Sequence, residues 1–173
     1  MQSDILEREV FAMNSFERLE DEACRDGIDV ISREFRNQTI GGLYCDGTIG
    51  INKSIDTTAE KSCVLAEELG HHYTSVGNII DMTDARNRKQ ERQARLWGYN
   101  KLIGLTGIIK AFRAGCQSRH EVADLLDVTE EYLQECIDCY RDKYGVYTIV
   151  DNYIVYFIPN LAVMEDITPR GII

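Results

Sequence analysis

The chain has 173 residues, of which 44% are hydrophobic and 28% are charged, a composition typical of a globular protein with a substantial core. Its formal net charge of −10 disfavours nucleic-acid binding, because phosphates would be repelled over most of the surface. No apolar stretch approaches the roughly 20 residues that span a bilayer, and the N-terminal segment is too charged for a secretory signal. We therefore expect a cytoplasmic protein that does not enter membranes.

Cysteines are frequent for a protein expected in the cytoplasm. Cys136 and Cys139 form a C-x-x-C pair, but no second pair and no nearby histidine completes a zinc site. In a reducing compartment thiols stay free, and buried cysteines behave as small hydrophobic residues. We expect reduced and mostly buried thiols at all six positions, which are residues 24, 45, 63, 116, 136 and 139.

The first elements expected along the chain are a helix and a β-hairpin. Apolar residues with helical spacing cover residues 15–35, with Gly27 as a point where the helix can break. Short apolar runs at residues 42–45 and 48–52 flank Asp46-Gly47, a dipeptide that tolerates the positive φ angles of a tight turn. The sequence therefore predicts a hairpin over these two runs.

Helices are predicted for most of the following chain. Thr57 and Glu60 form a capping-box pattern, which starts a helix that runs to about Tyr73, with Gly77 as its end. Further helical patterns cover residues 84–103, 108–114 and 120–144.

The C-terminal part combines a helix-turn-helix-like pattern, at residues 121–133, with a second hairpin, at residues 147–158. A DNA groove would repel the acidic face of the second helix, which carries Glu130, Glu131, Glu135 and Asp138. Pro159 closes the hairpin, and the last dozen residues are predicted to be a tail. We therefore expect one domain at residues 1–105 and a second, mainly helical region at residues 106–173.

The most informative motif is Glu67-Glu68-Leu69-Gly70-His71. It matches the zinc-protease signature H-E-x-x-H, except that Glu67 replaces the first histidine. Residues at i and i+4 lie on one face of a helix, so Glu67 and His71 can point at one ion, while Glu68 lies beside it and can accept a proton from water. Glutamate is itself a zinc ligand. Because it is anionic, it would leave the zinc-bound water less acidic than a second, neutral imidazole would.

Two alternatives compete with this arrangement. Glu68 and His72 are also at i and i+4, and they can hold a metal from the neighbouring stripe of the helix. In a purely structural interpretation, the glutamates and histidines form surface pairs that each contribute ~0.2–0.5 kcal/mol to helix stability.

Glu91, on the next predicted helix, is the candidate for a third ligand. Ala94 and Gly98 share its stripe, and small residues there would let this helix approach the first one closely. Asp81 and Asp84 are further candidates from the intervening segment. In the structural interpretation, Glu91 pairs on a solvated face with its arginine neighbours, which are Arg88, Arg92 and Arg95.

Together these motifs resemble the ImmA/IrrE family of metallo-endopeptidases, in particular its short members carried by phages and integrative elements. The resemblance covers about residues 15–145. It rests on Tyr44-Cys45-Asp46-Gly47, Ile51-Asn52, the capping segment, Leu65-Ala66-Glu67-Glu68-Leu69-Gly70-His71-His72-Tyr73-Thr74 and Glu91-Arg92-Gln93-Ala94.

The resemblance implies an α+β fold with a zincin-like core, in which a small antiparallel sheet and an active-site helix precede a helical C-terminal half. It implies that Glu67, His71 and Glu91 bind Zn²⁺ and that Glu68 is the general base. It also implies cleavage of a helix-turn-helix repressor, which would derepress genes of a phage or another mobile element. Glu67 departs from the family pattern, which has histidine at this position.

Three functions are therefore considered. The first is a zinc endopeptidase that cleaves a repressor, and the second is an inactive zincin-like protein that binds and sequesters the repressor without cutting it. The third is a DNA-binding regulator, which the acidic charge disfavours. Zincins hold their substrates as an added strand along an exposed sheet edge, and residues 48–52 are the candidate edge.

Overall fold

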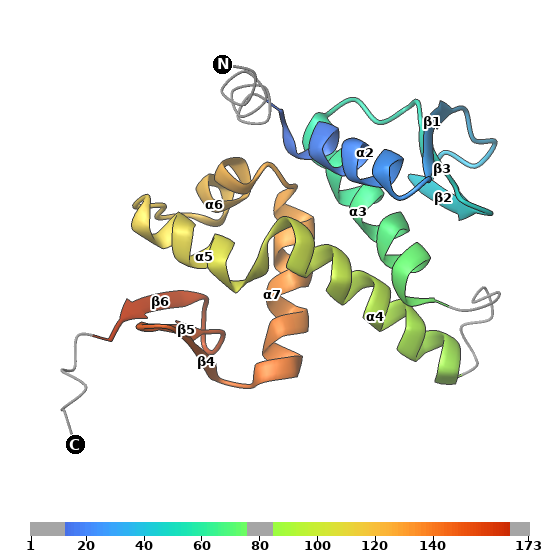
Figure 1. The fold of residues 1–173 in the computed structure, drawn as a ribbon. Helices are drawn as coiled ribbons and strands as arrows, with labels where there is room; N and C mark the ends of the chain where they lie inside the picture. Colours follow the sequence, from blue (N-terminus) through green and yellow to red (C-terminus); the bar gives the residue numbers. More distant parts are fainter. Residues whose placement is uncertain (1–12, 76–84, 167–173) are drawn as a thin grey trace, which may run out of the picture. The chain divides into compact units, whose positions relative to one another are not determined.

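The structure is a computed structural model that describes residues 13–75 and 85–166 (Figure 1). The chain divides into two compact units, one within Met1–Leu102 and Asp127–Thr129 and the other within Ile103–Leu126 and Glu130–Ile173. Each unit combines helices with a three-stranded sheet of its own. The predicted α+β fold is confirmed, and the assignment of a peptidase domain to residues 1–105 stays a prediction.

The first unit contains a sheet whose strand order is β1-β3-β2. Its helices are α2 (Ser15–Arg25), α3 (Thr58–Thr74) and α4 (Ala85–Leu102), and its strands are β1 (Asp29–Arg33), β2 (Gly42–Cys45) and β3 (Thr48–Asn52). The predicted hairpin is confirmed, because β2 and β3 pair antiparallel and Asp46 and Gly47 have φ angles of 44° and 77°. The sheet is mixed rather than purely antiparallel, since β1 pairs with β3 in parallel.

The predicted helix over residues 15–35 is wrong beyond Arg25, where α2 ends. Gly27 has a φ angle of 76°, a left-handed conformation that glycine adopts without steric cost. The residues that follow include the β-branched pair Val30-Ile31, which favours strands. They form β1, whose parallel partner β3 lies later in the chain and is invisible to a local helical pattern.

The predicted substrate edge at residues 48–52 is also wrong. β3 is the central strand of its sheet and is paired on both sides. Its Ile49 and Ile51 side chains are buried. The strands at the two edges of the sheet are β1 and β2.

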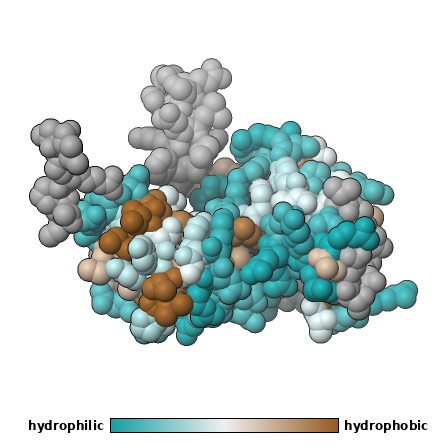
Figure 2. All heavy atoms as spheres, turned by 90° about the horizontal axis from the view of Figure 1, so that it is seen from below, coloured by the Kyte–Doolittle hydropathy of each residue, from teal (hydrophilic) through white to brown (hydrophobic). Residues whose placement is uncertain are grey.

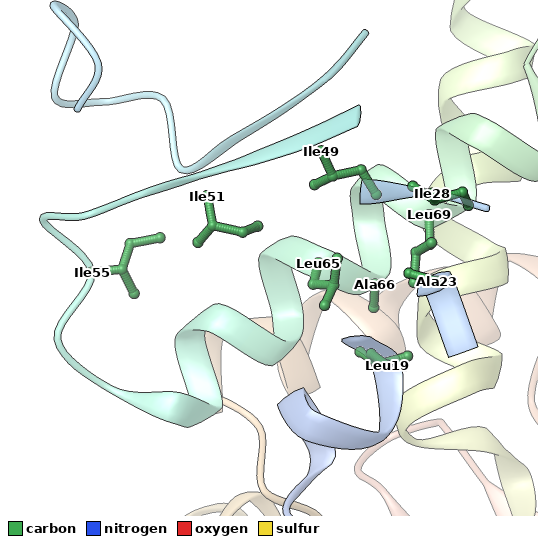
Figure 3. Packing of buried hydrophobic residues seen from close by; sticks show 9 residues of the cluster. All are labelled: Leu19, Ala23, Ile28, Ile49, Ile51, Ile55, Leu65, Ala66 and Leu69. Carbon is green, nitrogen blue, oxygen red and sulfur yellow. The ribbon is translucent and has the colours of Figure 1, made fainter. Parts of the chain in front are cut away.

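The core of the first unit determines how α3 is turned. Leu65, Ala66 and Leu69 of α3 pack with residues of α2, of β3 and of the adjoining loops (Figure 3). These partners are Leu19, Ala23, Ile28, Ile49, Ile51 and Ile55. Burial of each large apolar side chain contributes about 1.5–3 kcal/mol to the stability of the fold. Packing of these side chains therefore fixes the rotation of α3 about its axis, and Glu67, Glu68 and His71 remain only partly buried.

The second unit also combines helices with three strands. Its helices are α5 (Gly104–Arg113), α6 (Arg119–Leu126) and α7 (Glu130–Tyr144), and its strands are β4 (Tyr147–Val150), β5 (Tyr153–Tyr156) and β6 (Ala162–Glu165). The predicted second hairpin is confirmed as the antiparallel pair β4 and β5. The predicted tail is wrong at its start, because Ala162–Glu165 adds a third antiparallel strand beside β5. This strand is too short for its pattern to be recognised without its partner.

One face of the second sheet is apolar and exposed. Tyr147, Ile149 and Met164 are each more than half exposed, with accessible fractions of 51%, 57% and 57%. Val155, whose side chain points to the opposite face, is fully buried. Hydrophobic side chains gathered on the molecular surface are visible in Figure 2.

The thiols and the membrane prediction are also tested by the structure. All six cysteines are free, as predicted, but only Cys63 and Cys136 are buried, so the expectation of mostly buried thiols is wrong. Burial raises the pKa of the Cys63 thiol to about 12. Within the described residues, no helix is long and apolar enough to cross a bilayer.

Candidate functional site

Helix α3 carries the motif predicted for metal binding. Its N-terminus is capped by Thr57, because the backbone N–H of Glu60 donates to Thr57 Oγ1 at 3.2 Å, which is one of the two hydrogen bonds of the predicted capping box. The helix ends at Thr74, so the motif from Glu67 to His71 lies within regular helical structure. The predicted helix end at Gly77 lies outside the described residues.

The contact between α3 and α4 is unusually close. A Cβ atom added at Gly70 would lie only 2.2 Å from the carbonyl oxygen of Ala94, so glycine is required where the two backbones meet. Ala94 and Gly98 are both buried in α4, which confirms that small residues on this stripe permit a close approach. Glu91, one turn before Ala94, is thereby brought to His71.

His71 and Glu91 are in contact across the two helices. The distance between His71 Nε2 and Glu91 Oε2 is 3.4 Å, and the two side chains are 21% and 22% exposed. Burial lowers the pKa of the His71 imidazole, the charge of Arg95 lowers it further, and the charge of Glu91 opposes both effects. The neutral imidazole is the form that binds metal ions. Ser75 Oγ lies 3.4 Å from the other ring nitrogen, Nδ1.

Glu91 also pairs with Arg95, as the structural interpretation predicted for one of its arginine neighbours. The Arg95 Nε–H group donates to Glu91 Oε1 at 2.8 Å. Burial alone would lower the pKa of the Arg95 guanidinium, but the hydrogen bond to Glu91 and the charge of Glu67 raise it overall. Glu91 therefore presents one carboxylate oxygen to Arg95 and the other to His71.

The candidate base, Glu68, is held from the side of the sheet. The backbone N–H of Tyr44, in β2, donates to Glu68 Oε2 at 2.8 Å. A Cβ atom added at Gly42 would lie 2.9 Å from Glu68 Cγ, so the strand passes very close to this side chain. Burial raises the pKa of Glu68 to about 7, and the charges of Glu67 and Glu91 add to the rise, while the Tyr44 N–H opposes it.

The alternative pairing of Glu68 with His72 is less well supported by the structure. His72 Nδ1 and Tyr44 Oη form a hydrogen bond of 2.8 Å, and the two rings pack edge to face at 5.1 Å. Glu68 and His72 are thus both held by Tyr44. The sequence indicates Tyr44 as part of the hairpin and of the family resemblance, but nothing in the local pattern indicates its contact with α3.

The donor types at this site fit a zinc ion, since imidazole nitrogen and carboxylate oxygen are both accepted zinc ligands. Glu67 is placed one helical turn before His71, and its charge acts on Glu68 and on Arg95. However, within residues 13–75 and 85–166, no three His, Cys, Asp or Glu side chains gather closely enough to hold one ion. The structure therefore joins His71 with Glu91 without completing a three-ligand group, and Asp81 and Asp84 lie outside the described residues.

Comparison with known proteins adds one finding. Residues 23–137 match the family model for the IrrE N-terminal-like domain, peptidase family M78. The matched segment includes α3, with its motif, and α4, with Glu91 and Arg95. Searches of curated proteins and of solved structures returned no match.

Proposed function

Because the chain belongs to the IrrE N-terminal-like family of metallopeptidases, which is the ImmA/IrrE type, we propose that it is a zinc-dependent endopeptidase that cleaves a helix-turn-helix repressor. The observation that carries the proposal is the 3.4 Å contact between His71 and Glu91, which places two candidate ligands from different helices side by side. Glu67, on the same face of α3 as His71, is the third proposed ligand. Zinc bound there would supply Lewis acidity, which polarises a carbonyl group and lowers the pKa of water.

Glu68 is the proposed general base. Its carboxylate would accept a proton from the attacking water and deliver it to the nitrogen of the departing amine. The Tyr44 N–H group orients this carboxylate through Oε2, and the close passage of Gly42 limits its movement. The base is therefore positioned by β2 as well as by its own helix.

The same strand is the proposed docking edge for the substrate. β2 is at the edge of its sheet, it contacts Glu68 through Tyr44, and Leu43 is 55% exposed. A peptide added beside β2 would extend the sheet next to the base. We expect Leu43→Ser to raise KM for the repressor while zinc content stays unchanged. An unchanged KM would argue against docking at this edge.

The second candidate function is sequestration of the repressor without cleavage. It is favoured by the position of Arg95, which holds one oxygen of Glu91 and adds a positive charge beside the proposed metal site. Glu67 in place of histidine points the same way. In this case the family fold would serve as a binding surface alone.

Metal content and cleavage separate the two functions. The purified protein would be analysed for zinc by mass spectrometry and then incubated with a candidate helix-turn-helix repressor, using Glu68→Gln as the control. Near-stoichiometric zinc with cleavage that depends on Glu68 would establish the peptidase. Tight repressor binding with neither zinc nor cleavage would establish sequestration. Zinc without cleavage of this repressor, but with cleavage of other peptides, would retain the peptidase and reject the substrate.

A further inference from the structure

A pocket of about 390 Å³ lies within the second unit, bounded by α5, α6, α7 and the segment that leads from β5 to β6. Its volume falls in the range of sites that bind small molecules, which is about 300–1,000 Å³. The apolar part of its wall is formed by Ile108, Phe112, Val122, Ile137, Phe157 and Leu161. None of the residues proposed for metal binding or catalysis belongs to this unit, so the pocket is a separate feature.

The side chains that line the pocket differ in type from those of the chain as a whole. The whole sequence has 29 acidic and 19 basic residues. Yet among the described residues no Asp or Glu lines the pocket, whereas Arg119 and Arg141 both do. Carboxylates lie just outside this lining, because Asp138 pairs with Arg141 and Glu121 accepts a hydrogen bond of 2.6 Å from the backbone N–H of Gln117.

The two arginines differ in their partners. Arg141 forms an ion pair of 2.8 Å with Asp138, so its charge is balanced by a neighbour in α7. Arg119 donates a hydrogen bond to the neutral side-chain amide of Gln134, and the described part of the chain records no carboxylate within ion-pair distance of it. Arg119 is exposed and thus contributes a positive charge that no carboxylate among the described residues balances by an ion pair.

We propose that this pocket binds a carboxylate attached to an apolar group. The carboxylate pairs with Arg119, whose planar guanidinium matches a carboxylate with two parallel hydrogen bonds. The apolar part of the ligand lies against Phe112, Ile137 and Phe157, where it is removed from water. Either a free acid or the C-terminal residue of a peptide can present these groups, because the recognised chemistry is the same.

Calorimetric titration of the full chain tests the charge requirement. The ligands are octanoate, octanol and octylamine, which share an apolar tail and differ in the charge of the head group. We expect binding of octanoate alone. Equal binding of octanol, or no binding of any acid tested, would overturn the proposal.

A second titration distinguishes the two sources of carboxylate. The peptide Ala-Ala-Ala-Phe would be compared with its C-terminal amide, and both with octanoate. Binding of the free peptide that is tighter than binding of octanoate identifies a chain end, and the reverse identifies a free acid. Equal affinity of the peptide and its amide, together with no binding of octanoate, would contradict the proposal.

Variants locate the site. We expect Arg119→Ala to weaken binding by at least about tenfold, which corresponds to 1.4 kcal/mol, whereas Arg113→Ala, an exposed arginine of α5 outside the pocket, leaves it unchanged. Ala162→Phe places a ring at the pocket wall and blocks binding, and Met164→Phe on the same strand, outside the pocket, is its control. Unchanged affinity in both pocket variants would place the ligand elsewhere and reject the proposal. None of these readouts requires zinc or cleavage.

Discussion

Each unit has a glycine where two of its own helices are in contact, and the surroundings of the two glycines differ. In the first, a Cβ atom at Gly70 of α3 would lie 2.2 Å from a backbone oxygen of Ala94. In the second, a Cβ atom at Gly107 of α5 would lie 3.3 Å from a methyl group of Leu126, at the end of a flexible side chain. The first contact is therefore between two backbones, whereas the second can adjust.

The difference between the two helix contacts corresponds to a different feature in each unit. The close contact of α3 with α4 sets titratable groups of two helices side by side, with 3.4 Å between His71 and Glu91. The looser arrangement around α5 leaves a pocket of about 390 Å³ in the second unit. A contact between two backbones keeps the side chains of the two helices at a fixed distance. A contact through a side chain can adjust and can leave space beside it.

The largest expected effect concerns Glu68, the proposed base in the first unit. We expect Glu68→Gln to lower the rate of repressor cleavage by about 10²–10⁴-fold, the usual contribution of a general base. The fold should persist, since the glutamine carbonyl can still accept the hydrogen bond from the Tyr44 N–H group. Cleavage assays would use Glu60→Gln, an exposed glutamate of the same helix, as the control. Undiminished cleavage by Glu68→Gln would remove this residue from the mechanism.

The contrast between the two glycines predicts unequal effects of the same substitution. We expect Gly70→Ala to lower the free energy of unfolding by about 3 kcal/mol, because overpacking against a backbone cannot be relieved by a side-chain movement. Gly107→Ala should change it by less than about 1 kcal/mol, since the Leu126 methyl can move and alanine favours the helix. Urea unfolding of the two variants measures both values. Equal losses would show that the two contacts do not differ in rigidity.

The substitution in the motif itself gives a smaller effect. We expect Glu67→His to raise kcat for repressor cleavage by about tenfold, or 1.4 kcal/mol in activation free energy. A neutral imidazole in place of a carboxylate leaves more of the metal's charge to acidify the attacking water. Steady-state kinetics with saturating zinc would be compared with those of Glu60→His. A lower kcat in Glu67→His would mean that the carboxylate at this position is required.

The smallest effects test whether the units unfold separately. Thr57 caps α3 in the first unit, and Ser118 accepts a hydrogen bond of 3.2 Å from the Glu121 N–H group in the second. Replacement of either by alanine should lower stability by about 1 kcal/mol. Trp97, in α4, is the sole tryptophan and reports on the first unit. We expect Thr57→Ala, but not Ser118→Ala, to shift the fluorescence transition, and equal shifts would indicate cooperative unfolding.

Features with local causes were predicted correctly from the sequence. The Asp46-Gly47 turn and its two strands depend on residues close in the chain, as does the start of α3 at Thr57. The predictions that failed depended on distant partners. Val30 and Ile31 are found in β1 because β3 pairs with them, and Ala162–Glu165 is a strand because β5 lies beside it.

Predictions about the candidate site also differ according to whether their cause is local or distant in the chain. Helical spacing alone placed Glu67, Glu68 and His71 on one helix, and small residues at Ala94 and Gly98 correctly indicated that a second helix comes close. Contacts between side chains of different elements could not be read from that spacing. The bond from Tyr44 to Glu68 joins a strand to a helix.

Residue types and their spacing were therefore sufficient to indicate the family and to place Glu67, Glu68 and His71 on one helix, while the roles proposed for these residues stay predictions. The tertiary structure decided which of these residues meet. It paired His71 with Glu91, engaged His72 with Tyr44, placed β3 at the centre of its sheet, and left Arg119 without a carboxylate partner among the described residues. The physical reason is that helical periodicity is a property of neighbours in the chain, whereas distances between elements follow from the packing of the whole unit.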